Sequence, residues 1–328
     1  MKKSTKAWLI TAGSLVLLGC IIFVCTMSVL KWDFQKLSTV KYETNTYDVT
    51  DAFNDISLTT DTADIIFALS DDGKCRVECY EEENAKHSVT VENNELVVKI
   101  NEQKSWYDYI GFYLGSPKIT VYLPKAEYGV LTINESTGSI KAPKDFSFKS
   151  ADISVSTGDV DFFAASQEAV KIKTSTGNIC VENNTVGSLD LSVTTGKAAV
   201  SGVTCNGGIT VGVSTGKAAL TDIACKSVTS SGSTGDIYLK NVIAAEKLSI
   251  ERSTGNVKFD RSDAAEIFVK TNTGSVTGGL LTDKVFITQT DTGDVSVPKT
   301  VTGGRCEIKT DTGDIKIKKD ANCNSNLQ

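Results

Sequence analysis

The chain has 328 residues, a formal net charge of −6 and a single histidine. From Asp33 onward it carries 30 Lys and Arg residues against 40 Asp and Glu residues. This acidic balance argues against nucleic acid or anionic lipid as the main partner of that part, because both are bound through basic surfaces.

The N-terminus has the pattern of a single-pass membrane anchor. Residues 8–30 contain no charged residue and are numerous enough to cross a bilayer as a helix. Lysines in residues 1–7 precede this stretch, so the positive-inside rule predicts a cytoplasmic N-terminus and an extracytoplasmic remainder. Two alternatives stay open: a cleaved signal peptide, for which we find no cleavage site, and a lipoprotein cleaved before Cys20.

Residues 33–130 are rich in strand patterns without a strict period, and we expect them to form a β-rich N-terminal cap. Alternation of apolar and polar residues predicts strands at 75–80, 88–91, 96–100 and 119–123. Residues 60–65 (TDTADI) copy residues 310–315 (TDTGDI) with alanine in place of glycine. We therefore expect one degenerate coil of the repeat array, described next, within the cap.

The densest aromatic cluster outside the apolar stretch lies at 106–113 (WYDYIGFY). One interpretation is a loop that folds over the open end of the array. The other is a loop that contacts a ligand or a membrane surface, since aromatic rings with a polar tip suit either.

Ten Thr-Gly dipeptides recur at intervals of 19 or 20 residues. A period this regular predicts stacked coils, one for each repeat. The fold class is therefore all-β: a β-solenoid (β-helix) of about ten 19–20-residue coils at residues 131–318, followed by a flexible tail at 319–328. The repeat glycines are Gly138, Gly158, Gly177, Gly196, Gly216, Gly235, Gly255, Gly274, Gly293 and Gly313.

The apolar residues alternate on both sides of each glycine, at odd positions before it and at even positions after it. A period of two changes phase only at a bend, so each Thr-Gly is predicted to be a corner where glycine supplies positive φ. The threonines are expected to form a ladder of buried hydroxyls along the stack.

Where Gly232 takes an inward position, we expect the Arg252 side chain of the next coil to fill the space and to reach a sheet edge or a carboxylate. A local phase slip is the alternative.

The positions of the cysteines limit which disulfides can form. Cys205 and Cys225 both lie nine residues after a repeat glycine, so they are predicted to be stacked neighbours and form the one candidate disulfide of the array. Cys75 and Cys79 are too far apart along a strand to bridge, and Cys306 takes an inward position.

Lysines on the last strand, at 316, 318 and 319, are expected to discourage edge-to-edge aggregation.

No metal site or cofactor is predicted from ligand spacing, because the chain has no CxxC pair and His87 lies in what we interpret as a charged turn. The strongest acidic constellation flanks two successive repeat glycines and consists of Asp291, Asp294, Asp311 and Asp314. Stacking would bring these carboxylates to one corner, which makes them a weak calcium candidate. The competing interpretation is that aspartate is an ordinary turn residue at this corner.

The TGD-I/V coil signature follows a cap that contains 71–75 (DDGKC) and 119–124 (ITVYLP). Together these motifs resemble the bacterial putative-adhesin family, a domain of unknown function that includes LiaG-like membrane-anchored envelope proteins. The resemblance covers roughly residues 53–317. It implies a β-solenoid at the cell envelope and brings no catalytic residues with it.

Three functions are compatible with these features. The first is a membrane-anchored extracytoplasmic solenoid that presents a non-catalytic binding or adhesion surface to a cell-wall polymer or a protein partner. The second is an envelope-stress accessory protein that regulates a membrane partner. The third, a glycan-processing enzyme, would need a site built from carboxylates such as Asp311 and Asp314, because the chain shows neither a nucleophile motif nor a phosphate loop.

Overall fold

A computed structural model describes residues 3–33, 40–102 and 115–320 of the chain. Its one described helix, α1 (Lys3–Val29), includes an apolar stretch, Thr5–Val29, with a mean hydropathy of 2.4. By length and composition this helix can cross a membrane, and a signal sequence would pass the same test. The aromatic cluster at 106–113 and residues 321–328 of the expected tail lie outside the described residues.

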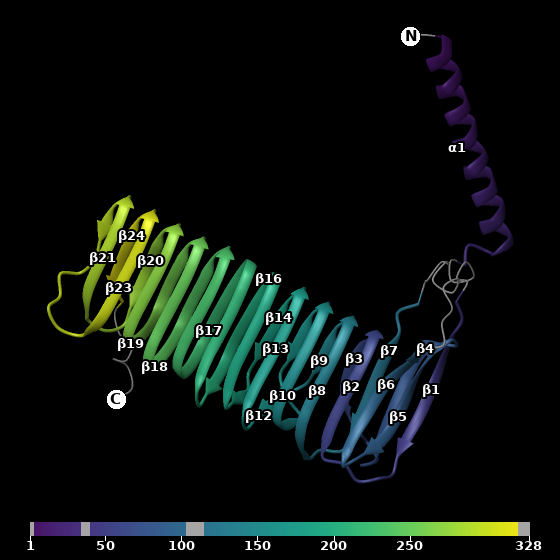
Figure 1. Cartoon of the computed structure of the whole chain (residues 1–328), viewed down its shortest axis with the longest axis horizontal. Coiled ribbons are helices and arrows are strands. Elements are labelled where there is room, and N and C mark those ends of the chain that lie inside the picture. Colours follow the sequence, from purple (N-terminus) through teal and green to yellow (C-terminus); the bar gives the residue numbers. More distant parts are fainter. Residues whose placement is uncertain (1–2, 34–39, 103–114, 321–328) are drawn as a thin grey trace, which may run out of the picture.

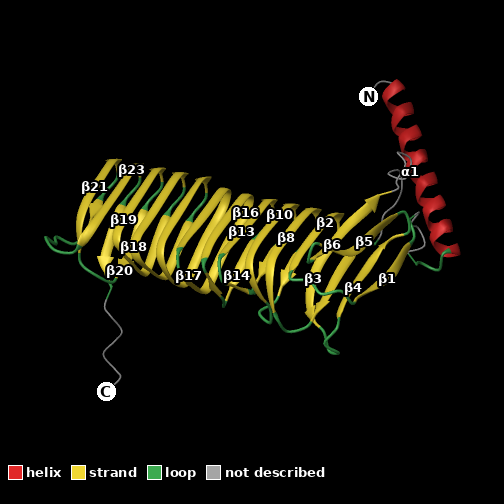
Figure 2. Ribbon diagram, turned by 60° about the horizontal axis from the view of Figure 1, so that its bottom comes forward, coloured by secondary structure: helices red, strands yellow, loops and turns green. Residues whose placement is uncertain are grey.

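The rest of the described chain forms one long stack of β-strands, with α1 joined at its N-terminal end (Figure 1). Its strands wind into successive coils (Figure 2). These coils enclose a continuous apolar interior. The predicted β-solenoid is therefore confirmed. The first strands are β1 (Tyr42–Val49), β2 (Asp55–Thr62), β3 (Asp64–Leu69), β4 (Cys75–Glu82), β5 (Ala85–Glu92), β6 (Glu95–Glu102) and β7 (Lys118–Leu123).

The central coils stack in parallel and in register, with each repeat threonine opposite the next one. Their strands are β8 (Glu127–Thr137), β9 (Ile140–Ala142), β10 (Ser147–Thr157), β11 (Val160–Phe162), β12 (Ala165–Ser166), β13 (Ala169–Thr176), β14 (Ile179–Glu182), β15 (Thr185–Val186), β16 (Ser188–Cys205), β17 (Gly208–Thr234), β18 (Ile237–Thr254) and β19 (Val257–Thr273). The last strands are β20 (Val276–Leu280), β21 (Lys284–Thr292), β22 (Val295–Ser296), β23 (Gly304–Thr312) and β24 (Ile315–Lys319).

The degenerate coil lies where the sequence places it. Ala63 occupies the glycine position, its N–H donates to Thr137 O at 3.1 Å, and β2 pairs with β8 in register. On its other side β2 and β3 pair with β6 and β7, so the chain builds this coil first, forms the cap outside it and then returns to continue the stack. The four strands predicted within the cap correspond to β4, β5, β6 and β7.

The C-terminal end departs from chain order. β23 pairs with β19 on one side and with β21 on the other, so the coil of Gly313 lies between the coils of Gly274 and Gly293. β24 likewise lies between β20 and β22. The expectation that Lys316 and its neighbours protect an outermost strand is therefore wrong. The outermost coil instead contains β21 and β22, and exposes Val285, Ile287 and Val295.

The buried hydroxyls lie two residues earlier than expected. The threonines directly before the glycines are stacked in register but exposed, because the alternation of buried and exposed residues ends at the third residue before each glycine. Thr174, at that third position, is buried and donates its hydroxyl to Gly158 O at 3.2 Å. Thr310 donates in the same way to Gly274 O at 2.9 Å. These hydroxyls satisfy carbonyl groups of the neighbouring coil.

Arg252 is 1% exposed and fills the space beside Gly232, as expected from the sequence. Its guanidinium donates to Val213 O at 2.9 Å and to Ser230 Oγ at 3.2 Å. Burial lowers the pKa of Arg252 to about 10. The charge therefore meets a backbone carbonyl and a hydroxyl inside the coil, not the sheet edge or carboxylate that the sequence suggested.

Candidate functional site

The repeat glycines form a structural corner. All ten have φ between +127° and +157°, which confirms the predicted positive φ. A Cβ at Gly177 would also overlap the carbonyl oxygen of Gly158 in the preceding coil. Glycine is needed here both for the backbone conformation and for the close approach of successive coils.

The acidic corner is held together by the chain's own donors. Asp314 Oδ1 accepts the backbone N–H of Asp294 at 2.9 Å, and its Oδ2 pairs with Lys316 Nζ at 2.6 Å. These two interactions, the backbone N–H first, lower the pKa of Asp314. The same bond recurs elsewhere, for example from Asn178 N to Asp159 Oδ1 at 2.7 Å.

This geometry favours the turn interpretation of the acidic corner. Asp291 and Asp311 are exposed. Within the described ranges, the four aspartates do not supply three carboxylates whose oxygens all lie within 4.8 Å of one another. The arrangement gives no support to the calcium candidate.

Cys205 and Cys225 are buried thiols in equivalent positions of neighbouring coils, next to the register pair Thr204 and Ala224. Burial raises the pKa of both thiols, to about 12 for Cys225. The stacking agrees with the sequence, and a disulfide between them remains a prediction.

A second corner column was missed in the sequence. Five residues adopt left-handed φ between +48° and +61° at intervals of 19 or 20, six positions after successive repeat glycines. The first of these corners separates β14 from the short strand β15, and the other four bend the continuous strands β16, β17, β18 and β19. Four of the five are the residue types that tolerate this conformation, so their spacing was the available signal. The column consists of Asn183, Gly202, Asp222, Asn241 and Arg261.

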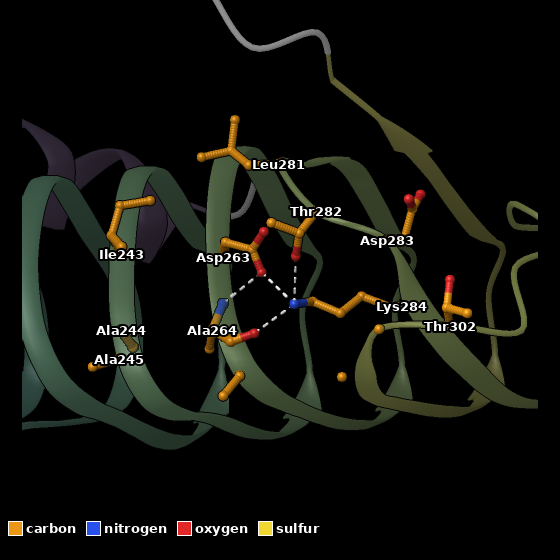
Figure 3. A pocket seen from close by; sticks show the side chains of 13 residues that line it. Ile243, Ala244, Ala245, Asp263, Ala264, Leu281, Thr282, Asp283, Lys284 and Thr302 are labelled. Atoms are coloured by element: carbon orange, nitrogen blue, oxygen red, sulfur yellow. Dashed lines mark hydrogen bonds and ion pairs between the residues drawn. The ribbon is translucent and has the colours of Figure 1, made fainter.

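The residues that follow these corners also stack in a column, and this column ends in a pocket. Cys225, Ala244 and Ala264 stack in this column. In the following coil the chain leaves the column after β20 and crosses to β21 through residues 281–283, passing over the place where β23 and β24 are inserted. The space left beside the crossing is a cavity of about 760 Å³, lined among others by Ile243, Ala245 and Thr302 (Figure 3).

A buried ion pair closes the end of the column. Lys284 Nζ lies 2.6 Å from Asp263 Oδ1, 2.6 Å from Ala264 O and 2.8 Å from Thr282 Oγ1 (Figure 3). Asp263 Oδ1 also accepts the N–H of Ala264 at 2.8 Å. The N–H and C=O of Ala264 are therefore bonded to side chains in place of a further strand, which blocks pairing at this edge.

The pair is 3% exposed at Lys284 and 7% at Asp263, and all three ammonium protons have an acceptor. Asp263 Oδ2 is buried without a hydrogen-bond partner among the described residues. Both charged groups thus hold the crossing in place beneath a pocket whose wall contains several alanines and the half-exposed Ile243. Such a surface can bind a ligand by shape and apolar contact.

Comparison with known proteins identifies the family. The model of the family described as Toastrack DUF4097 matches residues 53–216 and again residues 204–328. The chain belongs to the Toastrack family. No curated protein sequence matches this Toastrack chain.

Among solved structures, this Toastrack chain is similar to a "putative adhesin" from Bacteroides fragilis NCTC 9343, with 15% identity, 85% of this chain and 97% of that chain covered, and a TM-score of 0.39. It is also similar to a "putative lipid binding protein" from Parabacteroides distasonis ATCC 8503, with 14% identity, coverage of 86% and 98%, and a TM-score of 0.42. TM-scores below 0.5 at this level of identity carry no information about the function of the chain.

Proposed function

We propose that this Toastrack protein is a membrane-anchored extracytoplasmic protein that presents a non-catalytic binding surface at the bacterial cell envelope. The observation that carries the proposal is the position of two features at opposite ends of one rod. The apolar helix α1 joins the N-terminal cap, and the strands β19 and β21, which carry Asp263 and Lys284 of the pocket, lie near the other end (Figure 1).

The length of the rod supports this arrangement. Parallel strands lie about 4.8 Å apart, so ten stacked coils span roughly 50 Å. The register between the central coils is uninterrupted through whole strands, and each coil bonds to its neighbours on both sides. A stack of this kind resists bending and would hold the distal pocket several nanometres from the membrane to which α1 is attached.

Site-specific photo-crosslinking in intact cells tests the proposal. Ile243 at the pocket rim and Ile287 on the outermost coil are 42% and 46% exposed, so each can be replaced by a photoreactive residue with similar access. We expect the probe at Ile243 to capture a cell-wall polymer or an extracytoplasmic surface protein, and the matched probe at Ile287 to capture much less of it.

Other crosslinked or released products would favour a different function. Capture of a membrane sensor or transporter subunit would favour the regulatory alternative. Release of soluble fragments from wall material, lost on replacing Asp311 and Asp314, would favour an enzyme. Adducts with cytoplasmic proteins alone would contradict the proposal.

A further inference from the structure

The N-terminal cap contains a buried cluster of three metal-ligating side chains that the binding function does not use. Cys79 and Glu81 lie two residues apart on β4, so both point into the cap, and His87 faces them from β5. Their exposed fractions are 0%, 1% and 4%. The structure thus places His87 in a strand, where the sequence had suggested a charged turn.

The ligand atoms of the three residues lie close together. The sulfur of Cys79, a carboxylate oxygen of Glu81 and a ring nitrogen of His87 all lie within 4.8 Å of one another. His87 Nδ1 and Glu81 Oε2 are 2.7 Å apart. We propose that Cys79, Glu81 and His87 form a zinc site that joins β4 to β5.

The surrounding hydrogen bonds are those that orient metal ligands. His87 Nε2 lies 2.9 Å from Thr60 Oγ1, which is buried and can accept the ring N–H when Nδ1 binds a metal ion. Asn45 Nδ2 donates to Glu81 Oε1 at 2.7 Å, and the backbone N–H of His87 donates to Glu81 Oε2 at 2.7 Å. Partners of this kind set the tautomer of a ligating histidine and the orientation of a ligating carboxylate.

Charge balance favours a divalent ion at this buried position. A thiolate, a carboxylate and a neutral imidazole contribute two negative charges, which neutralise one Zn²⁺. Binding would release the thiol proton of Cys79, while the ring proton of His87 moves from Nδ1 to Nε2 and then donates to Thr60. Mixed sulfur, nitrogen and oxygen donors are typical of zinc among the common divalent ions.

A small cavity adjoins two of the three ligands. Glu81 and His87 line it, Cys79 does not, and its volume of about 20 Å³ is sufficient for one water molecule. Three protein ligands with one water is a common zinc coordination.

Cobalt substitution tests the site in the full-length chain, purified in non-chelating detergent micelles. Titration with Co²⁺ at pH 8 is expected to give one equivalent of tightly bound ion, with a sulfur-to-cobalt charge-transfer band that Zn²⁺ abolishes. Cys79→Ser and His87→Gln should each remove this band. Cys75→Ser is the matched control, because Cys75 is also buried on β4 but is not part of the cluster.

A second measurement on the wild type guards against variants that fail to fold. Under partially denaturing conditions, Zn²⁺ should slow alkylation of Cys79 at least tenfold while leaving that of Cys75 little changed. No charge-transfer band in the wild type, a band retained in Cys79→Ser, or equal protection of the two cysteines would overturn the proposal. These outcomes are independent of whether the distal pocket binds a ligand.

Discussion

At the scale of single residues, the repeat glycines carry the strictest requirement in the fold. Their φ values lie in a region that other residues rarely adopt, and their Cα atoms face the carbonyl oxygen of the equivalent corner residue in the neighbouring coil. A side chain at this position therefore meets both backbone strain and direct overlap.

Gly177→Ala is expected to destabilise the protein by about 3 kcal/mol or more, because the new Cβ would overlap Gly158 O at a strained φ. Urea unfolding measures the change. Gly212→Ala is the matched control: a methyl group at Gly212 would meet its nearest neighbour, Leu191 O, at an ordinary 3.7 Å, so its effect should stay below about 1 kcal/mol. Equal losses from the two substitutions would contradict this account of the corner.

A buried carboxyl at the junction of the cap and the solenoid should make stability depend on pH. Glu135 is 5% exposed, and burial, opposed by the N–H groups of Ala63 and Thr137, raises its pKa to about 7. Between the unfolded pKa of 4.5 and this value the folded state binds more protons, so stability should fall as the pH rises, by up to about 3 kcal/mol in total.

Glu135→Gln should remove this contribution and make the protein more stable than the wild type at pH 8, while the difference narrows or reverses at pH 4. Thermal unfolding between these pH values provides the measurement. Glu127→Gln, an exposed substitution on the same strand, should leave the pH dependence unchanged. If the stability of Glu135→Gln and that of the wild type changed with pH in the same way, the role of this carboxyl would be refuted.

At the scale of elements, both ends of the solenoid depart from chain order. The coil of Ala63 is enclosed by strands that follow it in the sequence, and the coil of Gly313 is inserted between two earlier coils. The inserted coil contributes two interfaces to the stack, and in a linear array stability is close to a sum of such interfaces. The crossing segments that this insertion requires also create the pocket.

Removal of residues 301–328 deletes the inserted coil. It should therefore also destabilise the outermost coil, which remains in the chain. The deletion removes the neighbour on which β21 and β22 stack, so we expect residues 284–300 to lose protection from hydrogen exchange. Removal of residues 321–328 alone is the control and should preserve that protection. If residues 284–300 stayed protected in the longer deletion, the coils would be stacked in chain order.

At the scale of the whole molecule, the two ends differ in chemistry. The N-terminal end combines the apolar helix with a cap that buries Glu81 and His87, and the C-terminal end combines an exposed outer coil with the pocket. Between them, the coil interior consists largely of aliphatic side chains and repeats with little change. This division places candidate chemistry at the ends and leaves the centre as a spacer.

Much of the molecule follows from the sequence because the repeat is local. Each Thr-Gly corner is specified within one coil by glycine and by alternation of apolar residues, so periodicity alone determined the solenoid, its register and the stacking of Cys205 near Cys225. The exposed threonine ladder was mispredicted because alternation was extended one step too far into the corner, where the backbone has already turned.

The order of the coils at the two ends, the pocket and the Cys79, Glu81 and His87 cluster were decided only by the tertiary structure. Identical coils present equivalent edges, so a repeat pattern specifies that coils stack without specifying which coil lies beside which. The pocket depends on the insertion of β23 and β24 out of chain order, and the cluster depends on how β5 folds back beside β4. The sequence period specifies neither.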